Sequence, residues 1–257
     1  MIAALPMYFA GENAHAMWWH GLAAALRAEG VLNVPDVLTG PEDYLAHWLA
    51  PDLLLSQTCG YPLTHALAGK VQLVGTLHYA AAGCDGANYC SHVLVRADDA
   101  RATLADYRGA VAAFNSPDSQ SGFNSFRHTL APLGQGFFRQ WLETGAHRQS
   151  IEKVRTGAAD IAAIDCVSFD LLHRHEPGWL AGVRILTQTA SAPGLPLITS
   201  LKTSPDQLTR LRAGLARAVA DPALSAARDA FGIVGFEVLP LAAYDVITHM
   251  ERLAGPT

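Results

Sequence analysis

The 257-residue sequence has no run of about 20 apolar residues, which is the length that a membrane-spanning helix requires. It has no cluster of basic residues either, because its 18 Lys and Arg are scattered and its formal net charge is −5. These absences argue against direct membrane insertion and against a nucleic-acid partner. The start of the chain, Met1 to Tyr8, lacks the basic segment and separate apolar segment of a secretory leader, and we expect it to form a core strand.

Motifs that mark common enzyme and metal sites are also missing. The chain has no G-x-S-x-G elbow, no P-loop, no G-x-G-x-x-G after a strand and no H-E-x-x-H. The four cysteines, at positions 59, 84, 90 and 166, do not have the paired spacing of a zinc site. Cys84 and Cys90 are close enough in sequence to bridge across a turn, although four half-buried thiols are the simpler interpretation. We therefore predict no catalytic residue, no metal and no cofactor.

What the sequence does contain is a regular alternation of short apolar stretches and amphipathic stretches, with 50% hydrophobic residues overall. Such alternation is typical of an α/β fold, in which helices cover a mainly parallel sheet. We expect strands at residues 2–8, 34–38, 52–56, 71–76, 89–96, 110–114, 160–165, 183–189 and 197–200. We expect helices that end near residue 30, begin near 41, span 120–130, 136–144 and 149–156, start at 204 and at 221, and include 246–253.

The long apolar stretch 89–96 has no helix before it, so it is suited to carry the chain from one lobe to another. We predict two lobes, each a mainly parallel sheet flanked by helices, with a ligand cleft between them. The first lobe is formed by residues 1–93 and 189–257, and the second lobe is formed by residues 94–188.

One candidate site follows the expected strand 110–114. The polar loop leads into an amphipathic helix that Asp118 or Ser119 can cap, so Ser119, Gln120 and Ser121 present backbone N–H groups at its positive end. Two hydroxyl groups lie in the same triplet, and Gly122 lets the backbone pack closely. A plain helix cap is the alternative, and for this short motif alone it is the stronger interpretation.

A second candidate segment runs from His147 to Asp165, where a helix ends at Gly157 and a strand of small residues ends at Asp165. Ligands of open α/β folds bind outside the carboxyl ends of strands, and Asp165 lies at such an end. An Asp in this place is also a common cap for the next helix, so the structural and functional interpretations are evenly balanced.

The order of these motifs resembles the substrate-binding proteins of phosphate and phosphonate ABC transporters, which have a type II periplasmic-binding-protein fold. Three stretches carry the resemblance: NYCSHVLVR at 88–96, TLADYRG at 103–109 with the following S-x-S-G loop, and H-x₃-I-x₂-V-x₂-G-x₂-D-I-A-A-I-D from His147 to Asp165. Gln120 stands where the family commonly has a second hydroxyl residue. The resemblance covers residues 88–166 best.

The resemblance implies a non-catalytic receptor that holds phosphate, a phosphonate or a related phospho compound. Backbone and hydroxyl donors of residues 119–121 would hold the anionic group, while His147 and Asp165 would face the ligand from the same lobe. Asp165 suits a ligand that also carries a cation or a hydroxyl group. The resemblance further implies contacts from the first lobe through Tyr8, Tyr61 or Tyr79.

The implied partners are a small anionic ligand and, for uptake, the membrane subunits of an ABC transporter. The family implies a periplasmic location, whereas a chain that starts directly on an expected strand also leaves a cytoplasmic location open. Two alternatives stay open at this point. One is binding or processing of a pyrimidine or vitamin-precursor metabolite, and the other is a ligand-sensing domain that acts through a protein partner.

Overall fold

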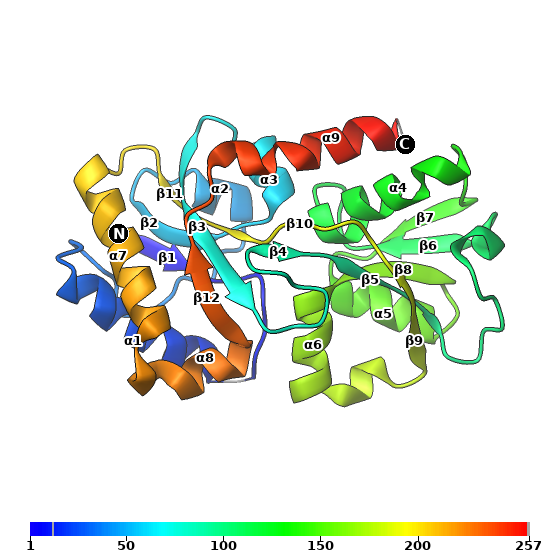
Figure 1. Ribbon diagram of the computed structural model, residues 1–257, viewed down its shortest axis with the longest axis horizontal. Helices are drawn as coiled ribbons and strands as arrows, with labels where there is room; N and C mark the ends of the chain where they lie inside the picture. The colour runs from blue at the N-terminus through cyan, green and yellow to red at the C-terminus, as the bar shows by residue number, and fades with distance from the viewer. Residues whose placement is uncertain (12, 256–257) are drawn as a thin grey trace. The chain divides into compact units, whose positions relative to one another are not determined.

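The computed structural model describes residues 1–11 and 13–255, and the chain divides into two compact α/β units (Figure 1). The first unit contains Met1–Ala80, Asp85–Ala87 and Pro193–Ala243. The second unit contains Ala81–Cys84, Asn88–Ala192 and the C-terminal segment that begins at Tyr244.

The first unit is built on a five-stranded mixed sheet with the strand order β1-β2-β11-β3-β12. β1 and β2 are parallel, while β11 is antiparallel to both β2 and β3, and β12 is antiparallel to β3. Its elements are β1 Ile2–Ala4, α1 Ala14–Ala28, α2 Tyr44–Trp48, β2 Leu53–Gln57, α3 Gly60–Thr64, β3 Val71–Tyr79, β11 Pro196–Ser200, α7 Pro205–Ala220, α8 Ser225–Phe231 and β12 Ile233–Glu237.

The predicted helix start after residue 203 is confirmed in this unit. The Ser204 side chain accepts a hydrogen bond from the Gln207 N–H (3.2 Å), and Pro205 occupies the first position of α7, where its missing N–H has no helical partner to lose. Leu211 and Leu215 then lie fully buried on one face of α7. Burying a Leu side chain contributes about 1.5–3 kcal/mol, so this stripe holds α7 in place.

The second unit has its own five-stranded mixed sheet, in the order β7-β6-β8-β5-β9. β6 lies between β7 and β8 and is parallel to both, whereas β5 is antiparallel to β8 and β9. Its elements are β4 Asn88–Tyr89, β5 Ser91–Arg96, β6 Val111–Phe114, the π-helical turn η2 Gln120–Asn124, α4 Ser125–Leu130, β7 Gln140–Glu143, α5 His147–Arg155, β8 Ile161–Asp165, α6 Cys166–His175, β9 Val183–Gln188 and α9 Asp245–Ala254; a further short strand, β10, spans Ala192–Pro193.

The predicted strand at 34–38 is wrong, because this stretch is irregular. Pro35 has no N–H for a ladder, and Asn33 has a positive φ of 55°. Side chains of α1 take up the carbonyl groups instead: Trp19 Nε1 donates to Pro35 O (3.2 Å), and Arg27 donates to Val34 O (3.0 Å).

The predicted helix at 136–144 is also wrong, since the chain forms strand β7 there. β7 pairs in parallel with β6, from Val111 opposite Gln140 to Phe114 opposite Glu143. Trp141 of this strand packs edge-on against four phenylalanines of the same unit. Aromatic residues suit a strand at a sheet edge, and this tertiary packing overrides the helical pattern.

The C-terminal helix lies in the second unit and not, as predicted, with the first lobe. α9 packs beside α4 and η2 (Figure 1). Asn124, which is fully buried, donates from Nδ2 to the Ile247 carbonyl (3.0 Å). Gln120 donates from Nε2 to the sulfur of Met250 (3.3 Å). Such long-range polar contacts leave no trace in local sequence patterns.

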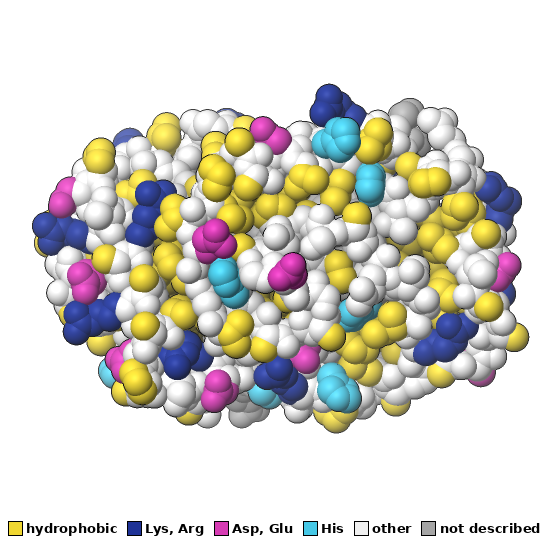
Figure 2. All heavy atoms as spheres, viewed as in Figure 1, with side chains coloured by type: hydrophobic (Ala, Val, Ile, Leu, Met, Phe, Trp, Pro, Cys, Tyr) yellow, Lys and Arg dark blue, Asp and Glu magenta, His cyan; other side chains and the backbone are white. Residues whose placement is uncertain are grey.

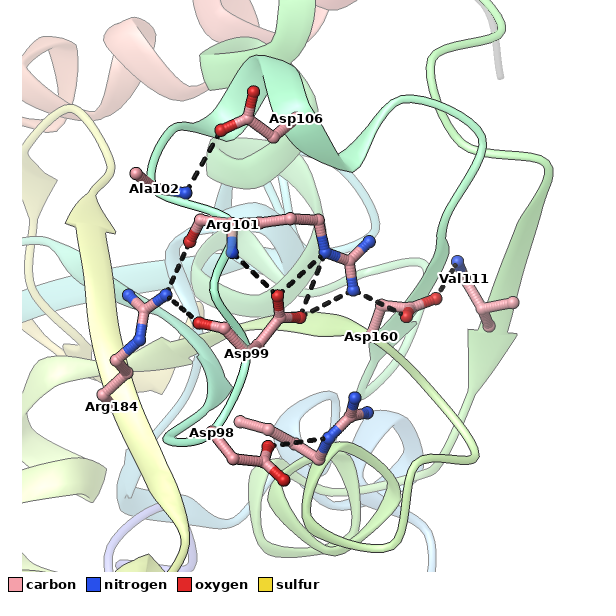
Figure 3. Close-up of polar contacts among 9 residues, drawn as sticks. Asp98, Asp99, Arg101, Ala102, Asp106, Val111, Asp160 and Arg184 are labelled. Carbon is pink, nitrogen blue, oxygen red and sulfur yellow. Dashed lines mark hydrogen bonds and ion pairs between the residues drawn. The ribbon is translucent and has the colours of Figure 1, made fainter.

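The amino ends of β6 and β8 are held by a charged network (Figure 3). Arg101 bonds both Asp99 (2.6 Å) and Asp160 (3.0 Å), and Asp160 also accepts from the Val111 N–H (2.9 Å). Arg184 donates to the carbonyl oxygens of Asp99 and Arg101 (2.8 and 2.6 Å). This network fixes the loop that precedes β6. It lies at the end of the sheet opposite to the carboxyl ends of these two strands.

Candidate functional site

Three polar segments meet at one end of the second sheet, the end at which its parallel strands finish. The segments follow β7, β6 and β8, which are adjacent parallel strands, so their carboxyl ends lie together. His147 follows β7, residues 119–121 follow β6, and Asp165 ends β8. The loops after β6 and β7 are joined directly, because the Gly145 N–H donates to Asn115 O (2.8 Å). This is the place where open α/β sheets bind ligands.

Ser119 begins the helical segment after β6. Its Oγ accepts from the Gly122 N–H (3.0 Å), and its carbonyl accepts from the Asn124 N–H (2.9 Å), which closes a π-type turn. Ser119 is therefore the cap, one of the two residues that the sequence offered for this role. The first N–H groups of a helical segment have no partner further back in the helix, so they are available to an anion.

Ser121 contacts His147 across the two loops. Ser121 Oγ lies 2.9 Å from His147 Nε2. Burial lowers the pKa of His147 from 6.5 to about 4, against a hydrogen bond to the Ala163 backbone that raises it. The ring is therefore neutral at pH 7, and its tautomer decides which of the two groups donates in the contact with Ser121.

The backbone at Ser121 is held from two sides. Its carbonyl oxygen accepts from Ser91 Oγ (2.9 Å), at the start of β5, and from Ser125 Oγ (2.8 Å), in α4. Gly122 provides the space for this arrangement, because a Cβ atom there would lie 1.9 Å from Asn115 Oδ1 and 3.1 Å from His147 Cε1. The close backbone approach expected for Gly122 is therefore observed, and no larger residue fits without displacing Asn115.

The side chain of Gln120 is directed elsewhere. Its Oε1 accepts from Asn124 Nδ2 (2.7 Å), and its Nε2 contacts Met250. The side chain is buried among these residues of the second unit. Any contact of Gln120 with an anion at the carboxyl end of β6 would therefore come from its backbone N–H.

Asp165 acts as the cap of α6. Its Oδ1 accepts from the N–H groups of Val167 (2.7 Å) and Ser168 (2.9 Å), which places one carboxylate oxygen on the helix N-terminus. Asp165 also pairs with Ser91 across the ladder between β8 and β5. The capping interpretation is thus realised, while a contact of Asp165 with a ligand remains a prediction.

The three tyrosines predicted from the first lobe all lie in the first unit. The rings of Tyr8 and Tyr79 meet edge-on, with centroids 5.2 Å apart, and Gln57 Nε2 donates to the Tyr79 hydroxyl group (3.2 Å). Tyr61, in α3 after the end of β2, stacks on His65 with centroids 3.9 Å apart. The structure therefore brings Tyr8 and Tyr79 together, and their contact with a ligand remains a prediction.

Two residues of the site were not selected from the sequence. Asn115 lies directly after β6, and its side chain fills the space that Gly122 leaves. Its position immediately after a buried strand was the available signal. Ser91 was part of the motif NYCSHVLVR, but its bond to the Ser121 carbonyl joins residues 30 positions apart. Only the sheet topology brings these two residues together.

This end of the sheet presents hydroxyl groups and helix-start N–H groups as donors, which suits binding of an anion. Within residues 1–11 and 13–255, no group of three or more His, Cys, Asp or Glu side chains is placed to hold a metal ion. In the same part of the chain, no helix is both long enough and apolar enough to cross a membrane. On the face drawn in Figure 2, acidic and basic side chains are interspersed, with no patch of one sign.

Two α/β units, each built on a five-stranded mixed sheet, are the architecture found in substrate-binding proteins. The sequence model of the family described as "ABC transporter, phosphonate, periplasmic substrate-binding protein" matches residues 51–244. The chain belongs to this family, whose members are non-catalytic receptors. A comparison with curated proteins finds no significant match.

Solved structures share the fold at low sequence identity. PhnD1 from Prochlorococcus marinus, in complex with methylphosphonate, has a TM-score of 0.78 and 13% identity, covering 98% of this chain and 97% of that chain. A binding protein component of an ABC phosphonate transporter (PA3383) from Pseudomonas aeruginosa has a TM-score of 0.77 and 15% identity, covering 98% and 86%. XAC2383 from Xanthomonas citri, bound to ATP, has a TM-score of 0.72 and 17% identity, covering 98% and 96%.

Proposed function

We propose that this receptor binds a ligand with a phosphonate or phosphate group, and that residues 119–121 with His147 hold the phosphorus oxyanion. The observation that carries the proposal is the contact between Ser121 Oγ and His147 Nε2 at the start of the helical segment after β6. Helix-start N–H groups, a hydroxyl group and an imidazole together offer the donors that an oxyanion needs.

The site can adapt its protonation to an anion. In the ligand-free protein, Ser121 Oγ is hydrogen-bonded to a neutral His147. When an anion is bound nearby, the imidazolium form is favoured. A protonated Nε2 then donates to Ser121 Oγ, and the Ser121 proton turns toward the anion. His147 thus supplies charge to the ligand through Ser121.

Family membership and the neighbours support the same chemistry. The names of two similar structures mention methylphosphonate and ATP, which share a phosphorus oxyanion. For this chain we propose delivery of the ligand to the membrane subunits of an ABC transporter. We further propose that Asp165 and the tyrosines Tyr8, Tyr61 and Tyr79 contact other parts of the ligand, which makes an aminoalkylphosphonate a good candidate.

The test is calorimetric titration of the purified protein with methylphosphonate, an aminoalkylphosphonate, inorganic phosphate, ATP and sulfate. Stoichiometric binding of at least one phosphorus compound, lost in the double variant Ser119→Ala, Ser121→Ala, is the expected result. If the double variant binds the compound with full affinity, residues 119–121 do not hold the oxyanion. A protein that binds none of the phosphorus compounds contradicts the ligand class.

A further inference from the structure

Three of the four cysteines lie together in the second unit, beside the end of β8. Cys84 Sγ and Cys166 Sγ are 3.6 Å apart, and the Cys90 thiol is hydrogen-bonded to Cys166. Cys166 comes directly after Asp165 and is the first residue of α6. The sequence left a bridge between Cys84 and Cys90 open and favoured four half-buried thiols. All four cysteines are free in the structure, and Cys166 lies next to Cys84.

The backbone fixes the positions of these sulfur atoms. The Cys90 N–H donates to the Gly83 carbonyl (3.1 Å), and the Cys166 N–H donates to the Cys90 carbonyl (3.1 Å). A Cβ atom on Gly83 would lie 2.7 Å from Cys90 Sγ and 3.4 Å from Cys166 Sγ, so both sulfurs face the same glycine. The three thiols are therefore held together by strand and turn hydrogen bonds.

We propose that Cys84 and Cys166 are a site of reversible oxidation that forms an intramolecular disulfide, with a peroxide as the oxidant. A disulfide bond is about 2.05 Å long, so the sulfurs must approach by about 1.5 Å, which a small side-chain rotation provides.

The reaction proceeds in two steps. The Cys84 sulfur attacks the peroxide, which breaks the O–O bond, gives a sulfenic acid on Cys84 and releases one water. The Cys166 sulfur then attacks the Cys84 sulfur and loses its proton, and the sulfenic oxygen leaves as a second water. Two thiols have then lost two electrons, and hydrogen peroxide has gained them.

The accessibility of the sulfurs sets the order of the steps. Cys84 is partly exposed, while Cys90 and Cys166 are buried. Hydrogen bonding among the thiols, together with burial, raises the pKa of Cys90 and of Cys166 above that of an ordinary thiol. Because the thiolate is the nucleophile, the second step speeds up as the pH rises.

Oxidation would join two segments that are distant in sequence. The disulfide ties Cys84 to the first turn of α6, where the Asp165 carboxylate caps the helix. A cross-link that closes so long a loop removes entropy from the unfolded chain, so the oxidised protein should have a Tm higher by about 5 °C or more.

The experiment treats the reduced full-length protein with a small excess of hydrogen peroxide and measures intact mass and Tm. We expect a mass loss of about 2 Da, reversed by dithiothreitol, with a non-reducing peptide map that joins Cys84 to Cys166. Cys59→Ser and Cys90→Ser should keep the mass loss, whereas Cys84→Ser and Cys166→Ser should each abolish it. Circular dichroism confirms that the variants fold.

Several outcomes overturn the proposal. One is addition of oxygen atoms without the mass loss. Another is a peptide map that joins a different pair, such as Cys84 with Cys90. A third is a cross-link between two molecules on a non-reducing gel. A fourth is loss of the disulfide in Cys90→Ser, because the proposed bond between Cys84 and Cys166 does not need the Cys90 thiol.

Discussion

Ser121 Oγ and His147 Nε2 lie 2.9 Å apart, although 26 residues separate them in the sequence. The contact joins the helical segment after β6 to the helix after β7, because the two strands are parallel neighbours and their carboxyl ends meet. Each of the two residues is polar and follows a strand, but only the strand order makes them partners. The predictions about binding depend on this pair.

Replacing Ser121 with Ala should weaken binding of the identified phosphorus ligand by about tenfold to a hundredfold. Hydrogen bonds to a charged group contribute about 1.5–3 kcal/mol, and this substitution removes one of them. Calorimetric titration measures the change. Ser225→Ala, at an exposed serine of the first unit, is the matched control and should keep full affinity. Equal affinities of the two variants would contradict a role for Ser121.

The pH dependence of binding should identify His147. Its pKa is about 4 in the free protein, and a bound anion raises it, so binding takes up a proton. Affinity should therefore increase as the pH falls from 7 toward 5, and His147→Gln should lack this component. The ligand's own titration cancels in the ratio of wild-type to variant affinity at each pH. A ratio that stays constant with pH is incompatible with proton uptake by His147.

His147 should also make the stability of the ligand-free protein depend on pH. The folded-state pKa of His147 is lowered below its ordinary value of 6.5, so the unfolded chain binds the proton more tightly. Stability is consequently lost as the pH falls from about 6.5 to about 4. His147→Gln should lose stability less steeply over this window, as measured by urea unfolding at several pH values.

Gly122→Ala should damage the site through space alone. The added methyl group would lie 1.9 Å from Asn115 Oδ1, which is an overlap, and 3.1 Å from His147 Cε1, so that it presses on the imidazole ring. Overpacking of this kind costs about 1–3 kcal/mol of folding free energy. Ligand affinity should fall at the same time, because His147 is displaced. Gly178→Ala is the control, since nothing lies within 4 Å of its added Cβ, and it should change neither quantity.

The sequence predicted those parts of the molecule that are governed by local chemistry. A cap at Asp118 or Ser119, the helix start at Ser204 and the buried strand that ends at Asp165 depend on neighbours within a few residues. Each is observed, with Ser119 as the cap. The errors occurred where distant contacts decide. Trp141 is in a strand because it packs against phenylalanines from other elements. The C-terminal helix joins the second unit because Asn124 bonds the Ile247 carbonyl, 123 residues away.

The charged network at the amino ends of β6 and β8 should make the protein sensitive to acid (Figure 3). The bond to Arg101 holds the pKa of Asp99 below its ordinary value, and the pKa of Asp160 is also lowered: burial opposes this shift, but the Val111 N–H and Arg101 outweigh it. Both carboxylates therefore stabilise the folded state above about pH 4, and this contribution disappears as the pH falls through their lowered pKa values.

Asp160→Asn should accordingly be destabilised most at neutral pH, and its free energy of unfolding should converge with that of the wild type as the pH falls below about 4. Urea unfolding from pH 7 to pH 3 measures the difference. Asp98→Asn is the control, because Asp98 is 84% exposed and forms only a 3.3 Å ion pair with Arg96, and exposed pairs contribute about 0–1 kcal/mol. If the Asp160 variant differs from the wild type by the same amount at every pH, the effect comes from lost packing and the carboxylate charge does not stabilise this edge.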